Sequence, residues 1–288
     1  MEAPAITIRG LINDLTRTLT GSLVHLDDLL LQLDNDSEEF DNAWLANQQM
    51  ERALELFIEL RSIYLIWQEK LQYKRESLGK GSLSTIDILT HKLNNALLVI
   101  IANCDLMSIY GDKSVDGLNN YQSIYKTIEN IKWFICETLN PNRYRFPNSE
   151  VKKALINNTK INRPPEKGKR IMLVEDDEDV MITIAEALAK AGYKIFACAT
   201  GREAITLFDK KKSRFSLYIV DYGLPDINGA ELVKNFILRK PEINILFTTG
   251  YNELILQEHS GLICQHQILM KPFSLPELYG KVRSILLH

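Results

Sequence analysis

Apolar residues in the first 140 positions recur at intervals of three and four, the spacing that places them on one face of a helix. Polar or glycine-containing breaks interrupt this pattern at 34–37, 79–82 and 111–113. We therefore expect four helices, joined by short links and packed as an all-α bundle. Their bounds are expected at about 5–34, 39–75, 83–110 and 116–139. The third helix carries one continuous core-facing stripe, which consists of Ile86, Leu89, Leu93, Leu97, Ile100, Cys104 and Met107.

A different pattern begins at residue 170, where short apolar runs alternate with helical stretches. The expected strands are Arg170–Val174, Lys194–Ala197, Ser216–Val220, Ile243–Thr248 and Gln267–Met270. The expected helices lie at about 178–191, 201–211, 228–238, 252–260 and 275–287. Such alternation is typical of a five-stranded parallel sheet covered by helices on both faces. Functional side chains of this fold class lie at the carboxyl ends of the strands.

Charge and proline content separate the two patterns. Residues 141–170 hold nine Lys or Arg and two Asp or Glu, together with four prolines, whereas residues 1–140 have a net charge of −8. We therefore expect a helical bundle over 1–140, a basic linker over 141–169 and an α/β domain over 170–288. The basic stretch suits either nucleic acid or a tether that keeps acidic domains soluble, and the lack of an adjoining nucleic-acid-binding fold favours the tether.

Composition predicts a cytoplasmic protein that does not bind a membrane. The longest uninterrupted apolar run, Ala96–Ala102, has seven residues, whereas a membrane-spanning helix needs roughly 20. The start MEAPAITIRG lacks the basic and apolar segments of a secretory signal. Four widely spaced cysteines in apolar runs indicate free buried thiols rather than a zinc site or a disulfide framework.

The chemistry expected of the α/β domain lies at its strand ends. Glu175 and Asp176 follow the first expected strand, Asp221 ends the third, Thr249 the fourth and Lys271 the fifth. Converging carboxylates repel one another, so a hard cation is needed to hold them together, and oxygen ligands in an open site suit Mg²⁺. A lysine and a hydroxyl beside them can bind the oxygens of a phosphoryl group.

Five separated motifs in residues 169–288 occur in the order found in one family. They are Leu173-Val174-Glu175-Asp176-Asp177, Val220-Asp221-Tyr222-Gly223-Leu224-Pro225-Asp226, Asn228-Gly229, Thr248-Thr249-Gly250 and Lys271-Pro272-Phe273. This set resembles the receiver domain of two-component response regulators, which implies a flavodoxin-like fold. The family usually has an aromatic residue three positions before the lysine, where this chain has Ile268.

The resemblance implies a role for each matching residue. Asp221 would be the phospho-acceptor, and it would bind Mg²⁺ directly together with Asp176 and the carbonyl of Gly223. Glu175 would complete the acidic pair at the metal. Thr249 would be the switch hydroxyl and Lys271 the lysine that pairs with the phosphate. The peptide bond before Pro272 would be cis.

A second resemblance concerns the expected third helix of the bundle. His91 lies two positions from core residues on either side, so it points away from the apolar stripe. The context Thr90-His91-Lys92-Leu93-Asn94-Asn95-Ala96-Leu97 resembles the H-box of sensor histidine kinases and histidine phosphotransferases. His91 would then be a phospho-acceptor and Asn95 the asparagine that assists at the phosphoryl group. Lys92 stands where the family usually has an acidic residue that acts as a base in kinase chemistry.

ATP-dependent kinase activity is not expected. About 30 residues separate the fourth expected helix from the α/β domain, and no GxGxxG or GxxxxGK[ST] motif occurs. Two functions stay open: a phosphorelay protein that uses Asp221 and His91, and a docking or dimerisation module with a silent kinase-like bundle that the receiver gates. A truncated hybrid kinase that borrows an ATP domain is a weaker third. The expected partner is a histidine kinase, a phosphotransfer protein or another receiver, and the bundle closes either within one chain or across a homodimer.

Overall fold

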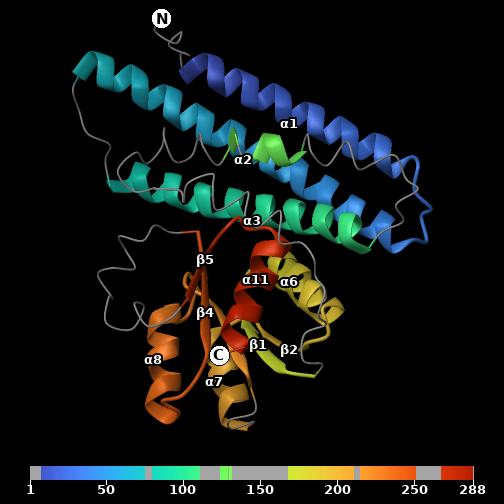
Figure 1. Cartoon of the computed structure of the whole chain (residues 1–288). Coiled ribbons are helices and arrows are strands. Elements are labelled where there is room, and N and C mark those ends of the chain that lie inside the picture. Colours follow the sequence, from blue (N-terminus) through green and yellow to red (C-terminus); the bar gives the residue numbers. More distant parts are fainter. Residues whose placement is uncertain are drawn as a thin grey trace, which may run out of the picture. The chain divides into compact units, whose positions relative to one another are not determined.

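The structure is a computed structural model of the 288-residue chain, and it describes residues 8–74, 80–110, 124–128, 130–131, 168–210, 215–250 and 267–287. The chain divides into two compact units, Met1–Arg145 and Phe146–His288. We call them the N-terminal and C-terminal units and describe each separately (Figure 1). Apart from Gly168 and Lys169, the expected basic linker falls outside the described residues.

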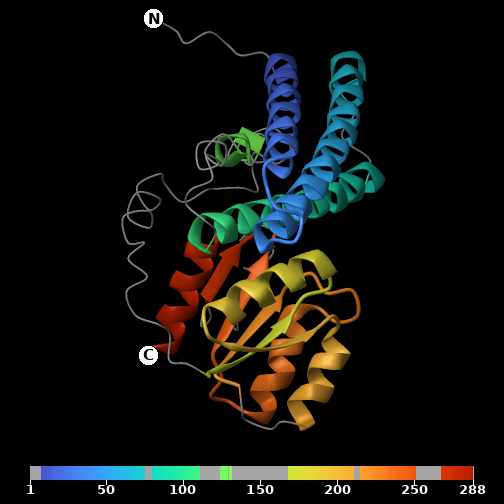
Figure 2. The ribbon, with the colours of Figure 1, turned by 90° about the vertical axis from the view of Figure 1, so that its right-hand side faces the viewer.

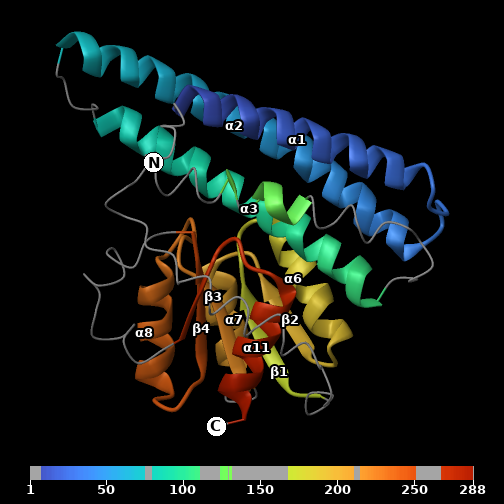
Figure 3. The same ribbon diagram turned by 45° about the horizontal axis from the view of Figure 1, so that its top comes forward.

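Three long helices dominate the N-terminal unit: α1 (Ile8–Leu30), α2 (Glu38–Lys74) and α3 (Lys80–Tyr110). Helices α1 and α2 run antiparallel, because Asn47 donates to Asp27 at 2.8 Å near one end and Arg61 donates to Asn13 at 3.1 Å near the other (Figure 3). An acidic first turn favours the start of α2, where the Ser37 hydroxyl also accepts a backbone hydrogen bond.

Two of the expected helix ends are wrong. Helix α1 ends at Leu30 rather than at 34, because the chain turns at once and the Asp34 side chain accepts the backbone N–H of Asp36. Helix α3 begins at Lys80, so Gly81 lies inside a helix rather than in a break. An isolated glycine weakens a helix but does not end it when the flanking residues continue the pattern.

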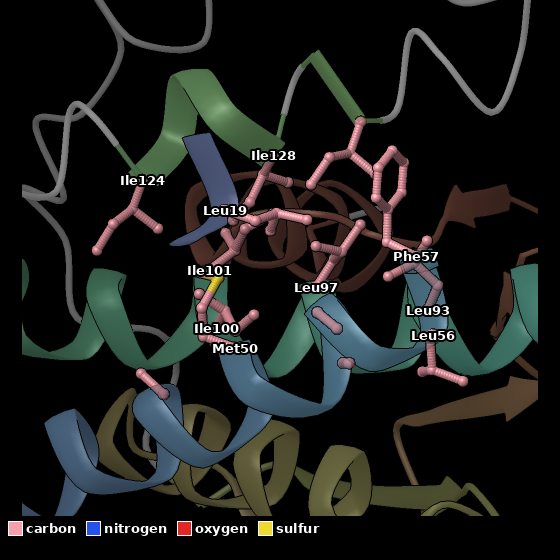
Figure 4. Close-up of a cluster of buried hydrophobic side chains, with 14 of the residues drawn as sticks. Leu19, Met50, Leu56, Phe57, Leu93, Leu97, Ile100, Ile101, Ile124 and Ile128 are labelled. Carbon is pink, nitrogen blue, oxygen red and sulfur yellow. The ribbon is translucent and has the colours of Figure 1, made fainter. Parts of the chain in front are cut away.

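The apolar core of the N-terminal unit is assembled from one chain. All seven residues of the expected α3 stripe are buried in it, together with residues of α1 and α2 such as Leu19 and Phe57 (Figure 4). Ile124, Ile128 and Ile131, from the described part of the expected fourth helix, join the same cluster. The rest of 116–139 lies outside the described residues.

Two polar pairs, one buried and one part-buried, fix residues 124–128 on the other helices. The Ser22 and Thr127 hydroxyls, which are 1% and 3% exposed, share a hydrogen bond of 3.2 Å. The Tyr125 hydroxyl donates to the Asp105 carboxylate of α3.

Within the described residues one helical segment, Thr85–Tyr110, is long and apolar enough to cross a membrane, with a mean hydropathy of 1.4. The segment contains no long uninterrupted apolar run, because Asn94, Asn95, Asn103 and Asp105 interrupt its apolar residues. Since 83% of its apolar window is buried inside the protein, the segment has the character of a core helix.

The C-terminal unit contains one parallel sheet with the strand order β2-β1-β3-β4-β5. The strands are β1 (Arg170–Val174), β2 (Lys194–Cys198), β3 (Leu217–Asp221), β4 (Ile245–Thr249) and β5 (Gln267–Met270). The described helices are α6 (Glu178–Lys190), α7 (Gly201–Lys210), α8 (Gly229–Arg239) and α11 (Leu275–Leu286). The expected fold class, an all-α unit and a flavodoxin-like parallel sheet, is confirmed; the expected helix at 252–260 lies outside the described residues.

Helices cover both faces of this sheet (Figure 2). Helices α7 and α8 pack on one face, where Phe208, Tyr218 and Phe236 form an aromatic cluster; the Phe208 and Phe236 rings stack at 4.6 Å. Helices α6 and α11 cover the other face, and the Tyr279 hydroxyl of α11 donates to the Ala187 carbonyl of α6 at 3.0 Å. Because both faces are covered, polar side chains gather at the carboxyl edge of the strands.

Candidate functional site

Buried polar side chains meet at the carboxyl edge of the sheet, on the face covered by α6 and α11. Glu175 directly follows β1, Asp221 ends β3, and Thr248 pairs with Asp221 across β3 and β4. Side chains alternate along a strand, and the neighbours of these residues face α7 and α8: Val174, Val220 and Phe247. The three side chains are 0%, 1% and 0% exposed. A charge so deeply buried needs a partner of opposite sign.

Lys271 supplies that partner. It follows β5, and its Nζ donates to both carboxylate oxygens of Glu175 at 2.8 Å and to Oδ2 of Asp221 at 3.0 Å. The next peptide bond, Lys271–Pro272, is cis, as the resemblance implied. The sequence prediction that Glu175, Asp221 and Lys271 converge from three strands is therefore confirmed.

The two carboxylates and the ammonium perturb one another's protonation. Burial raises the pKa of Glu175 to about 8; the attraction of Lys271 opposes this rise and the charges of Asp221 and Asp176 add to it. Burial acts to lower the pKa of Lys271, but the attraction of Asp221 and Glu175 prevails and raises it. Lys271 therefore stays protonated at neutral pH, and Glu175 accepts a proton at a higher pH than an ordinary glutamate does.

Three carboxylates in this site can face one cation. Glu175, Asp176 and Asp221 each offer an oxygen atom, and these atoms lie within 4.8 Å of one another. Asp176 is exposed to solvent, whereas the other two are buried. Three carboxylates against one lysine leave an excess of negative charge, and hard oxygen donors with one open side suit Mg²⁺. The residues present therefore fit a magnesium ion.

Two buried threonines end β4, next to the strand that carries Asp221. Thr249, which ends β4, is fully buried. Its neighbour Thr248 is also fully buried, and its hydroxyl has no hydrogen-bond partner among the residues that the structure describes. Thr248 was part of a quoted motif, but sequence reasoning gave it no role, because only the strand register shows that it pairs with Asp221.

The loop between β3 and α8, residues 222–228, carries Gly223. The Gly223 N–H lies 3.4 Å from Oδ1 of Asp221 and donates to it. The two ends of the loop are held by backbone hydrogen bonds, from Tyr222 to Thr248 at 2.9 Å and from Gly229 to Tyr222 at 3.1 Å. Gly229 must lack a side chain, because a Cβ there would lie 2.4 Å from the Asp221 carbonyl oxygen.

Sequence reasoning missed the side chain that fastens this loop to α7. Asp226 accepts the backbone N–H of Gly201 at 3.0 Å and that of Arg202 at 3.0 Å. Partial burial acts to raise the pKa of Asp226, but the N–H groups of Gly201 and Arg202 outweigh it, and the pKa lies below the usual range. The one indication in the sequence is Gly201, because glycine has a low helix propensity and yet stands at the first position of α7.

His91 and Asn95 lie one turn apart on α3 in the N-terminal unit. His91 is partly exposed and lies outside the apolar core, as its spacing predicted. Asn95 is 4% exposed, and Lys92 is exposed. The two residues therefore share a helix, but the amide of Asn95 is far less accessible than the imidazole of His91.

Comparison with known proteins concerns the C-terminal unit. The family model of the response regulator receiver domain matches residues 171–283. The response regulator receiver protein CpdR of Brucella abortus is 32% identical over 119 residues, which cover 41% of this chain and 98% of CpdR. The sensor kinase CckA of the same organism is 28% identical over 116 residues, which cover 40% of this chain but 12% of CckA.

Among solved structures, the response regulator protein TrrA from Thermotoga maritima, in complex with Mg²⁺-BeF, is 27% identical. The match covers 41% of this chain and 99% of that protein, with a TM-score of 0.37.

Proposed function

The chain belongs to the response regulator receiver family, and from that premise we propose that it is a phosphorelay protein whose receiver accepts a phosphoryl group on Asp221. Receiver domains of this family act in two-component signalling, are phosphorylated on an aspartate, and interact with histidine kinases or phosphotransfer proteins. The observation that carries the proposal is the buried contact between Lys271 and both Glu175 and Asp221. Those are the residues that the family's motifs assign to phosphoryl transfer.

The geometry supports an in-line transfer from phosphohistidine. A carboxylate oxygen of Asp221 forms a bond to phosphorus while the P–N bond breaks, and the electron pair stays on the departing imidazole nitrogen. Lys271, already within 3.0 Å of Asp221, pairs with the negative phosphoryl oxygens. The hydroxyl of Thr249 is the candidate switch group at the same strand end.

Glu175, Asp176, Asp221 and the carbonyl of Gly223 would hold the metal ion. When bound, Mg²⁺ supplies positive charge that offsets the carboxylates and the incoming phosphoryl oxygens. The loop hydrogen bonds keep Gly223 next to Asp221. The arrangement leaves Asp176 exposed, so this side chain is accessible to solvent and to an incoming ion.

The proposal extends to the bundle, where His91 would exchange the phosphoryl group with a receiver. Its support is the H-box pattern and the partial exposure of His91. Two observations favour the alternative of a docking module with a silent bundle: the amide of Asn95 is buried, and exposed Lys92 replaces the usual acidic residue. We also place the protein in the cytoplasm, where the buried free thiols of Cys104 and Cys198 persist.

The test uses the purified full chain with Mg²⁺ and radiolabelled acetyl phosphate. We expect base-labile label on the wild type and none on Asp221→Asn, while Asp209→Asn, which removes an exposed carboxylate of α7, keeps the label. Absence of label on the wild type would contradict the receiver proposal.

The role of the bundle is tested with the same label. Transfer to His91 should appear as base-stable, acid-labile label that His91→Gln loses and that His25→Gln, on α1, keeps. Label that remains on Asp221, also in the presence of unlabelled protein, would favour the docking module.

A further inference from the structure

The loop between β3 and α8 buries Leu224 in the core, whereas Pro225 and Asp226, which follow it, are exposed. Backbone hydrogen bonds hold Tyr222 at its start and Gly229 just after its end. Between them the chain passes through Gly223, whose carbonyl belongs to the proposed metal site. A loop of this kind takes up several conformations unless a side chain in it is fixed to a rigid element.

Asp226 provides such a fixed point in the exposed part of the loop. Its two carboxylate oxygens accept hydrogen bonds from Gly201 and Arg202, one each, and both distances are 3.0 Å. These donors are the first two backbone N–H groups of α7, which have no partner inside their own helix. A carboxylate is also the side chain that the positive end of a helix favours. The contact thus joins the loop after the phospho-acceptor to a helix that begins 25 residues earlier in the chain.

The fit between loop and helix is steric as well as electrostatic. A Cβ at Gly201 would lie 2.0 Å from the Cγ2 atom of Ile227 and 3.4 Å from Oδ1 of Asp226. Glycine at this position therefore allows the loop to lie directly against the backbone of α7. Because Ile227 is next to Asp226, the two contacts together determine where the turn at Gly223 lies relative to Asp221.

We propose that Asp226 is a positioning residue for the metal site: its two hydrogen bonds to the start of α7 hold the loop so that Gly223 faces Asp221. This inference rests on the proposed function and extends it. Asp226 does not touch the phosphoryl group or the metal; it acts through Gly223, whose N–H also contacts the carboxylate of Asp221 at 3.4 Å. Loss of the anchor should therefore weaken cation binding more than phosphoryl transfer at saturating cation.

The experiment compares Asp226→Ala and Asp226→Asn with the wild type in the full chain. Magnesium binding to the metal-free, unphosphorylated protein is measured by calorimetry. The rate of labelling by acetyl phosphate is measured across a magnesium titration. We expect the magnesium dissociation constant and the half-saturating concentration to rise roughly tenfold for alanine. The rate at saturating magnesium should stay within about twofold, because no group that contacts the phosphoryl is removed.

Two comparisons separate positioning from general stability. Asp226→Asn retains one oxygen acceptor, so its effect should fall between those of the wild type and the alanine variant, and this variant tests the idea even when alanine unfolds the unit. Asp209→Asn is the matched control: Asp209 also lies on α7 and makes an exposed ion pair with Arg239 at 3.3 Å, remote from the loop. It should leave the magnesium constant unchanged.

An unchanged magnesium constant in folded Asp226 variants would overturn the inference while leaving the proposed function intact. A fall of the saturated rate without a change in the magnesium constant would also overturn it, because Asp226 would then act on transfer rather than on the metal. Failure of the wild type to bind magnesium and take up label would refute the proposed function itself, and the inference with it.

Discussion

Replacement of Lys271 by methionine tests the buried ion cluster most directly. The change keeps an unbranched side chain of similar length but removes an ammonium that donates at 2.8, 2.8 and 3.0 Å to two carboxylates. Both carboxylates are at most 1% exposed, so neither can be solvated in exchange. Removal of one partner from a buried ion pair costs about 3–5 kcal/mol. We expect the metal-free C-terminal unit to lose stability of that order at pH 8.

This loss should grow as the pH rises above 8, where Glu175 ionises in the wild type but not yet in the variant. The pKa of Glu175 is already raised to about 8, and Lys271 is the group that pulls it down, so the variant raises it further. A carboxyl group whose pKa is higher in the folded state than in the unfolded state binds its proton more tightly when folded. Its stabilising contribution is complete below the unfolded value of 4.5 and is lost as the pH rises through the folded value. Below that value Glu175 is protonated and needs no counter-charge.

The two units must be followed separately, and two buried methionines allow this. Met172 lies in β1 and Met50 in α2, and both are fully buried. Peptide-resolved oxidation of each methionine in a urea titration gives the unfolding midpoint of its own unit. Only the Met172 midpoint should fall in Lys271→Met, and Lys194→Met, at an exposed position of β2, should change neither.

A loss of less than about 1 kcal/mol at pH 8, the size of an exposed ion pair, would contradict the assignment of Lys271 as the counter-charge. An equal loss at pH 7 and pH 10 would contradict it as well. In that case Lys271 would not be the counter-charge of buried, ionised carboxylates.

Further predictions concern both units. A Cβ at Gly201 would lie 2.0 Å from a side-chain atom of Ile227, so Gly201→Ala should destabilise the C-terminal unit by about 1–3 kcal/mol. A Cβ at Gly21 would meet open space in α1, so Gly21→Ala should stabilise the N-terminal unit by about 0.5–1 kcal/mol. Urea titration measures both changes. Ser22→Ala removes the buried hydrogen bond between the Ser22 and Thr127 hydroxyls and should lower the free energy of unfolding of the N-terminal unit by about 0.5–1.5 kcal/mol. Adding Thr127→Val should cost less than the sum of the two single changes if the pair acts as assigned, and urea titration measures this. Burial raises the pKa of Cys198 to about 11, so iodoacetamide should alkylate this thiol slowly at pH 8 in the folded protein and faster as the pH rises toward 11. Mass spectrometry of the Cys198 peptide measures the rate, and rapid modification at pH 8 would refute the prediction.

The elements of this protein were largely readable from the sequence because their signals are local. The strands β1 and β5 have the predicted bounds, and the α3 stripe forms the core of the N-terminal unit. The helix ends were predicted less accurately. The glycine-containing segment 79–82 was predicted as a break, but Gly81 lies inside α3. Whether a helix ends at such a segment depends on which side chains of the adjoining helical turns are buried, and the amino-acid composition of the segment does not show that.

The site divides in the same way. Asp221, Glu175 and Lys271 were found from the sequence because each ends or follows a strand, and parallel strands bring those ends to one edge. Their protonation, however, depends on burial and on distances that are set only when strands far apart in the chain pair. Strand register alone shows that Thr248 lies opposite Asp221. The contact between Asp226 and Gly201 joins residues that are 25 positions apart, so no local pattern predicts it.

The sequence by itself therefore determined the fold class, the order of the elements and the set of reactive side chains, because hydrophobic periodicity and strand ends are properties of short segments. Only the tertiary structure decided that Lys271 contacts both Glu175 and Asp221, that residues of all the described helices of the N-terminal unit share one core, and that Asp226 accepts hydrogen bonds from the start of α7. These are contacts between distant segments. Their geometry follows from packing of the whole unit rather than from any local pattern.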